Sequence, residues 1–172
     1  ILKKSKSLLR HPAPPGFGST SHRIFCQPAD ATPGIPDDSI DLVVTSPPFL
    51  NVVDYVGDNW LRNWLCDFSL DRSALWQSSK LDSWTANMRS TLAEQNRILR
   101  PGGWLAFEVG EVNKGKLNLD ETIVETGRAV GLRPDSVLIN RQRFTKTANC
   151  WGVANNEGGT NTNRVVMFQK SR

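Results

Sequence analysis

The sequence predicts an α/β fold with a doubly wound sheet, and three observations support that prediction. Ile40 to Thr45 form a near-continuous β-branched run, which is typical of a strand buried on both faces of a parallel sheet. Two later segments, 83–99 and 119–130, repeat apolar residues with the period of a helix. Strand-like segments alternate with these helices, as in folds that pack helices on a largely parallel sheet.

The remaining elements are predicted in order along the chain. His22 to Cys26 is short and mixed, and we expect the first strand there. Further segments are a helix over 60–68, strands over 104–109, 136–144 and 164–170, and an Asn-, Gly- and Thr-rich loop over 145–163. Gly131 is expected to follow the last turn of the helix over 119–130. No helix separates the last two strands, so we expect an antiparallel edge pair.

Length and charge suggest one domain with a polyanionic partner. The 172 residues suit a single domain, and 38% apolar residues are enough for a core. Residues 1–21 are basic and then rich in Pro and Gly, which predicts a tail before a folded domain over 22–172. The net charge of +4 and the pI near 9.2 favour nucleic acid as a partner, although part of this charge lies in the tail.

Cysteine usage and hydropathy indicate the cellular setting. The three cysteines, Cys26, Cys66 and Cys150, form no CxxC pair and no Cys/His cluster, so we expect free thiols, a reducing compartment and no metal site. No apolar run has the length of a membrane span, and the N-terminus lacks the apolar stretch of a signal peptide. We therefore expect a cytoplasmic protein without a membrane partner.

The most informative motif is Ser46-Pro47-Pro48-Phe49, directly after the buried strand. The carboxyl end of a parallel strand is where α/β sheets place their ligands. Two successive prolines fix φ at both positions and remove two N–H donors. The result is a stiff loop that offers acceptors only, namely the Ser46 hydroxyl oxygen and the Pro47 carbonyl. The alternative interpretation is that the two prolines merely end the strand.

Such a loop suits the chemistry of an exocyclic base amine. The nitrogen is a poor nucleophile because its lone pair is delocalised into the ring. Two acceptors that bind its two hydrogens would favour tetrahedral geometry and free the lone pair for attack on a sulfonium methyl group. Much of the rate would come from positioning. Phe49 offers a flat face on which a base extruded from the duplex could stack.

At this point the chain resembles the DNA amino-methyltransferases that modify cytosine N4 or adenine N6. The matching stretches are PDDSIDLVVTSPPF over 36–49, ILRPGGWLAFEVGEV over 98–112 and TKTANCWGVANNEGGTNTNRVVMFQK over 145–170. The first two are loosely shared with other class I methyltransferases, and the third is similar to a bacterial and phage subgroup. The resemblance implies a Rossmann-like class I sheet, S-adenosylmethionine as cofactor and DNA as substrate, in a restriction, phage or housekeeping setting.

The resemblance also implies roles for particular residues. Ser46, Pro47, Pro48 and Phe49 would form the acceptor-amine site, and a Ser-first motif is commoner for cytosine N4 than for adenine N6. Asp30 matches an acidic residue that meets the cofactor's adenine, and Thr45 is assigned to the same cofactor site. Asp30 could equally stabilise a turn. Cytosine C5 chemistry is disfavoured because no cysteine follows a proline.

One part of the family pattern cannot be placed. The family binds its cofactor with a strand followed by a Gly-rich turn, and Phe17-Gly18-Ser19-Thr20 has neither the strand nor the helix such a turn needs. The strand over 40–45 would then lack its cofactor-strand neighbour and leave an apolar edge unpaired. We therefore expect a partial sheet that a second chain or a second copy completes.

Nucleic-acid contacts are expected around the long C-terminal loop. The candidate residues are Arg141, Arg143, Lys146, Trp151 and Arg164, with Lys114 and Lys116 in an earlier turn. Basic residues of this kind bind phosphate without reading sequence. Four tryptophans in helical context, Trp60, Trp64, Trp76 and Trp84, are expected in the core rather than stacked on bases. The alternative interpretation of the loop is a solvated turn region.

Two other functions remain open at this stage. An RNA or protein-glutamine N-methyltransferase would reuse a Pro-Pro-aromatic loop, because an amide nitrogen has the same lone-pair problem. Ser46 and the Asn-rich loop count against that interpretation. A non-catalytic DNA-binding subunit or remnant is the third, and the unplaced Gly-rich turn supports it.

Overall fold

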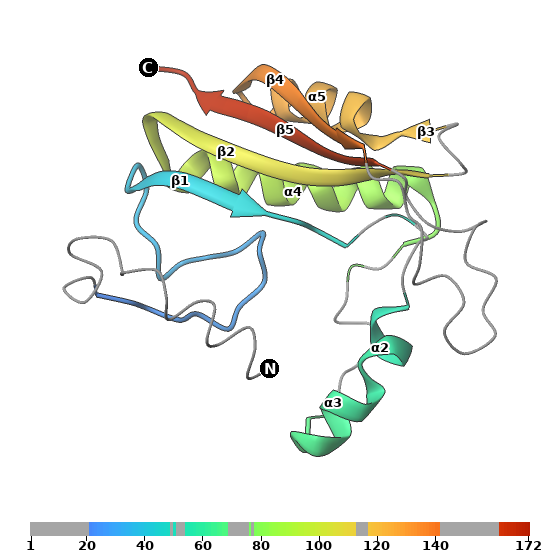
Figure 1. Cartoon of the computed structure of the whole chain (residues 1–172). Helices are drawn as coiled ribbons and strands as arrows, with labels where there is room; N and C mark the ends of the chain where they lie inside the picture. The colour runs from blue at the N-terminus through green and yellow to red at the C-terminus, as the bar shows by residue number, and fades with distance from the viewer. Residues whose placement is uncertain are drawn as a thin grey trace, which may run out of the picture.

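The computed structural model describes residues 21–48, 50, 54–68, 76, 78–112, 117–141 and 162–172. Figure 1 shows a twisted sheet with two long helices behind it and two short helices that extend away from it. The elements are β1 (Ile40–Thr45), α2 (Tyr55–Asp58), α3 (Trp60–Leu65), α4 (Leu81–Ile98), β2 (Leu99–Val112), β3 (Leu117–Asn118), α5 (Leu119–Ala129), β4 (Leu132–Arg141) and β5 (Thr162–Lys170).

The sheet is mixed, with strand order β1-β2-β5-β4 and the short β3 paired to β2. β1 and β2 are parallel, and α4 is the crossover helix between them. β5 is antiparallel to both of its neighbours, β2 and β4. The predicted α/β class is confirmed, and so is the antiparallel pairing of the last two strands. Within the described residues, β1 and β4 are the two edges of the main sheet.

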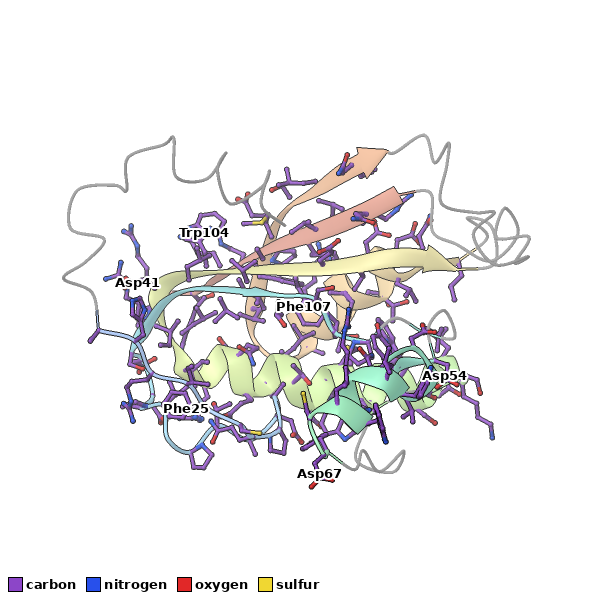
Figure 2. All side chains as sticks on the ribbon, turned by 60° about the horizontal axis from the view of Figure 1, so that its bottom comes forward. Phe25, Asp41, Asp54, Asp67, Trp104 and Phe107 are labelled. Carbon is purple, nitrogen blue, oxygen red and sulfur yellow. The ribbon has the colours of Figure 1, made fainter. Side chains whose placement is uncertain are left out.

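The core lies on one face of the sheet. Leu105, Phe107 and Val109 alternate along β2, and all three are fully buried, whereas Trp104 and Ala106 on the opposite face of the strand are half-buried. Figure 2 shows Phe107 and Trp104 on opposite sides of β2, with Phe107 toward α4. Both long helices, α4 and α5, pack on the Phe107 side (Figure 1).

The two long helices were predicted within a few residues. α4 buries a stripe that includes Trp84, Met88 and Leu92, as its period predicts. α5 ends at Ala129, and Gly131 follows with φ at +88°, the left-handed conformation that glycine adopts most readily. β2 begins at Leu99, five residues earlier than predicted, because the Pro-Gly-Gly segment 101–103 belongs to the strand instead of preceding it.

The predicted first strand over 22–26 is wrong. These residues form no strand and are exposed, and Ile24 is 97% exposed. Arg23 lies over the ring of Phe25 at 4.8 Å from its centroid, so this aromatic side chain makes a local contact and no sheet contact. No described strand pairs with these five mixed residues, so they form no ladder within the described part of the chain.

The tryptophans of the predicted helix over 60–68 were also misplaced. The helix exists as α3, which ends at Leu65, but Trp60 is 65% exposed and Trp64 is 73% exposed. Trp84 is fully buried, as expected, and Trp76 is half-buried. The helical period of α3 therefore marks an apolar stripe that no described residue covers.

The turn-rich segment before β1 is fastened to the carboxyl-terminal end of α4. Glu94 accepts hydrogen bonds from the Thr32 backbone N–H at 2.7 Å and from its hydroxyl at 2.5 Å. Arg97 binds Glu94 at 2.7 Å and also binds Asp37. The hydrogen bond from Arg97, together with those from Thr32, lowers the pKa of Glu94 from 4.5 to about 2, although burial opposes this.

Lys170 of β5, the last described strand, holds the same segment through hydrogen bonds. Lys170 donates from Nζ to Asp38 Oδ1 at 2.6 Å and to the Asn96 carbonyl oxygen at 2.7 Å. Asp38 and Ser39 donate their backbone N–H groups to the carbonyls of Arg97 and Ile98, at 3.1 and 2.9 Å. The amino-terminal end of β1 is thus held by both α4 and β5.

Replacing Glu94 by Gln should lower the free energy of unfolding at pH 7 by about 1–3 kcal/mol, because a charged acceptor of four hydrogen bonds is lost. The carboxylate's stabilisation is complete above its unfolded pKa of about 4.5 and is lost as the pH falls to about 2. Urea unfolding of both proteins between pH 7 and pH 2.5 measures this. The exposed Glu125→Gln variant is the control, and a wild-type advantage over E94Q that stays constant with pH would contradict the assignment.

Replacing Gly127 by Ala should destabilise the protein even though Ala is the better helix former by about 1 kcal/mol. A methyl group at Gly127 would lie 2.4 Å from Cε1 of the fully buried Phe168 on β5. Overpacking costs about 1–3 kcal/mol, so we expect a net loss of about 1–2 kcal/mol in thermal unfolding. Glu125→Ala, exposed on the same helix, should be neutral, and a G127A protein more stable than wild type would show that α5 can shift away from β5.

Candidate acceptor-amine site

The Ser-Pro-Pro loop leaves the sheet at the carboxyl-terminal end of β1. Thr45 is half-buried and pairs with Phe107 of β2. Ser46 follows and is exposed, Pro47 is buried, and Pro48 is half-buried. Leu50 is buried in the core, while Phe49 lies outside the described residues. The loop therefore has one wall packed into the protein and its single hydroxyl in the open.

A hydrogen bond from α4 fixes this loop. The indole Nε1–H of Trp84 donates to the Pro48 carbonyl oxygen at 2.9 Å, and the Trp84 side chain is fully buried. Pro47 and Pro48 have no N–H of their own, so they cannot close a backbone-bonded turn. With the Pro48 carbonyl bound, the acceptors that remain for a ligand are those named from the sequence, the Ser46 hydroxyl and the Pro47 carbonyl.

β1 presents an uncovered edge and an uncovered face beside this loop. Among the described strands it pairs with β2 alone. Leu42 is 55% exposed and Val44 is 74% exposed, and both point away from the face that α4 covers. By strand alternation Ser46 belongs to the same side as these residues, and so does Glu108 one strand over. The expected unpaired edge is present within the described part of the chain.

The two predicted cofactor residues are far apart. Thr45 is next to the loop, but Asp30 lies in a turn in which Ala31 N–H donates to the Pro28 carbonyl at 3.2 Å. The neighbouring Ala29 carbonyl accepts from Gln95, near the carboxyl-terminal end of α4. That end of α4 adjoins the start of β1, six residues from its tip. Asp30 thus lies in a turn near the amino-terminal end of β1 and Thr45 at its carboxyl-terminal end, and the assignment of both to the cofactor site stays a prediction.

Among the predicted phosphate contacts, the structure describes the side chain of Arg164 alone. Its Nη1 donates to both carboxylate oxygens of Asp120, at 3.2 and 3.0 Å, and its side chain is 17% exposed. Arg164 is therefore an ion-pair partner of the buried Asp120 at the start of α5, and its contact with nucleic acid stays a prediction. The Arg141 side chain and all of Arg143, Lys146, Trp151, Lys114 and Lys116 lie outside what the structure describes.

Two features of the site were not predicted. Trp84 was expected in the core, but its N–H was overlooked. A buried indole N–H needs an acceptor, and Trp84 lies in the first turn of α4, the helix that runs back along β1. Glu108 was not singled out, and it is half-buried within β2 on the Ser46 side of the sheet. Asp54, after the loop, caps α2 by accepting from the Gly57 N–H at 3.1 Å.

Other ligand-binding features are sparse in the described residues. They hold no group of three or more His, Cys, Asp or Glu side chains that could bind a metal. Cys26 and Cys66 are free and exposed. No helix in the described ranges is long and apolar enough to cross a bilayer. A shallow groove lined by Arg133, Gln169 and Lys170 lies at the other end of the sheet from Ser46.

Comparison with known proteins gives matches at the level of structure. No family model and no curated protein sequence matches the chain. The structure of TTHA0409 from Thermus thermophilus, provisionally classed as a DNA modification methylase and solved with S-adenosyl-L-methionine, is 20% identical with a TM-score of 0.51. That match covers 80% of this chain and 50% of the Thermus chain.

Two further solved structures are more distant. A SAM-dependent methyltransferase from Methanosarcina mazei is 12% identical, with a TM-score of 0.48 over 98% of this chain and 76% of its own. The cytosine-N4-specific PvuII DNA methyltransferase is 15% identical, with a TM-score of 0.47 over 80% and 44% of the two chains. This chain thus spans about half the length of the Thermus protein. Its described part has the Rossmann-like α/β fold of class I S-adenosylmethionine-dependent methyltransferases, as a partial sheet.

Proposed function

We propose that this protein transfers a methyl group from S-adenosylmethionine to the exocyclic amine of a DNA base. The observation that carries the proposal is a loop without N–H groups at Pro47 and Pro48, fixed by Trp84, at the carboxyl-terminal end of β1 in a methyltransferase fold. S-adenosylmethionine is the cofactor found with the Thermus protein of the same fold. When bound, it supplies an electrophilic methyl group on a sulfonium centre.

The chain's own residues act on the acceptor amine. The Ser46 oxygen and the Pro47 carbonyl accept the two N–H hydrogens, which orients the nitrogen lone pair toward the methyl group. The cofactor would supply the methyl group and leave as S-adenosylhomocysteine, and the methylated nitrogen would lose one proton to solvent. Because the loop is rigid before the base arrives, little reorganisation is required during the transfer. Phe49 is proposed as the surface on which the extruded base stacks.

Cytosine N4 is the proposed acceptor, in preference to adenine N6. A hydroxyl in the first position of the motif is what distinguishes this chain from the Asp- and Asn-first patterns. A hydroxyl oxygen can accept from the amine while its own O–H donates elsewhere, and Glu108 is a half-buried acid on the neighbouring strand β2. The DNA itself is proposed to contact Arg141, Arg143, Lys146, Trp151 and Arg164, the last of which also pairs with Asp120.

A further chain segment is proposed to complete the sheet and the cofactor site. Doubly wound sheets carry helices on both faces and place ligands where two adjacent strands send their helices to opposite faces. β1 sends α4 to one face, so its missing neighbour should be a parallel strand whose helix covers Leu42 and Val44. A second copy paired edge to edge by a twofold axis would be antiparallel, so the completing segment is proposed to be of different sequence.

Ser46→Ala should abolish methyl transfer without unfolding the protein, because it removes one of two acceptors from an exposed position. The assay is labelled methyl transfer to DNA by the full-length protein, followed by nucleoside mass spectrometry for N4-methylcytosine and N6-methyladenine. Phe49→Ala should behave similarly. Ser90→Ala, exposed on α4, is the matched control. Full activity in both S46A and F49A would contradict the catalytic assignment. Methyl transfer to RNA or protein, with none to DNA, would show that DNA is not the substrate.

Val44→Lys should prevent completion of the sheet, because an uncovered apolar side chain that becomes buried would be replaced by a charge. Calorimetric titration with S-adenosylmethionine should show affinity reduced by about tenfold or more, equivalent to about 1.4 kcal/mol. Leu138→Lys, similarly exposed but on the opposite edge strand, should bind as wild type. Tight cofactor binding by residues 1–172 as an isolated monomer would contradict the need for a completing segment.

A further inference from the structure

Trp84 lies outside the acceptor loop and donates a hydrogen bond from its side chain to the loop, at the Pro48 carbonyl. The bond joins residues 36 positions apart, and it is made by an indole with no exposed surface. Trp84 lies in the first turn of α4, an 18-residue helix packed along β1 and β2. The donor therefore lies on a long helix whose buried face packs into the core.

The loop needs such an outside donor. A loop of ordinary residues can be held by its own backbone N–H groups, but positions 47 and 48 have none. Fixed φ angles limit the shape of Pro47-Pro48, yet they do not set how the loop stands relative to the sheet. That placement decides where the Ser46 oxygen and the Pro47 carbonyl point.

We propose that Trp84 is a positioning residue for the acceptor amine. By binding the Pro48 carbonyl, it sets the orientation of the neighbouring Pro47 peptide and keeps the Pro47 carbonyl directed at the amine. It also prevents the Pro48 carbonyl from turning into the site and competing for the same hydrogens. This inference rests on the proposed methyl transfer, since it assigns Trp84 to the same reaction without contact to either reactant.

The decisive change removes the indole N–H and leaves the shape. Trp84→3-benzothienylalanine replaces the N–H by sulfur in a ring system of nearly the same size, and Trp84→Phe is the genetically encoded counterpart. Both should lower kcat for DNA methylation by about 10- to 100-fold, the size expected for misplacement of reacting groups by around 1 Å. KM for DNA and affinity for S-adenosylmethionine should stay within about twofold, because neither ligand touches Trp84.

The controls separate positioning from lost stability. Met88→Leu and Leu92→Ala alter the same buried face of α4 without reaching the loop, and Leu92→Ala should destabilise the fold by more than the benzothienyl variant does. At a temperature where all variants are folded, both controls should keep wild-type kcat. An equal fall in kcat for Leu92→Ala and the benzothienyl variant would show that Trp84 acts only through packing in the core. Wild-type kcat in the benzothienyl variant would also contradict the positioning role.

A second measurement does not depend on activity. The backbone amide resonance of Ser46 should shift in the ¹H–¹⁵N spectrum of the benzothienyl variant and remain in place in Met88→Leu. If wild-type protein methylates nothing but this shift is seen, the proposed reaction is wrong while the positioning of the loop by Trp84 stands. If the protein is active and Ser46 does not respond, the positioning proposal is wrong and the reaction stands.

Discussion

The structure depends on the way α4 holds both ends of β1. At the carboxyl-terminal end of the strand, Trp84 binds the Pro48 carbonyl. At the amino-terminal end, the carbonyls of Arg97 and Ile98 accept from the backbone N–H groups of Asp38 and Ser39. One helix of 18 residues thus spans the strand and sets the position of the segment before it and the loop after it. Everything proposed for the loop requires that this span stay rigid.

The parts of the fold that sequence could predict are those in which local pattern and burial agree. Ile40 to Thr45 are predicted as a strand because β-branched residues run nearly without interruption, and β1 occupies those six residues. The period of α4 and the glycine after α5 mark real boundaries, since a single face of each helix meets the core. The antiparallel last pair follows from the lack of any helix between the two strands. In each case a local feature of the sequence accounts for the element.

Sequence failed where partners distant along the chain decide the outcome. The segment over 22–26 has strand-like residues but no neighbouring strand, so it stays irregular. Trp60 and Trp64 follow a helical period, but both are exposed and no described residue covers them. This chain spans about half of the Thermus protein's length. In the sequence Arg164 resembles a surface cation, but in the structure it pairs with Asp120, which is 44 residues away in the chain. The loop over 46–49 was singled out from its own residues, whereas the donor that fixes it was not, because that bond joins two separate elements.

The position of β5 has a consequence for biogenesis. This strand is the last described element along the chain, yet it lies inside the sheet, between β2 and β4. During synthesis from the amino terminus, β2 and β4 have no bridge until residues 162–170 leave the ribosome, and Lys170 reaches Asp38 only then. A nascent chain halted before that point would expose two unsatisfied strand edges, a state prone to aggregation and a natural target for a chaperone.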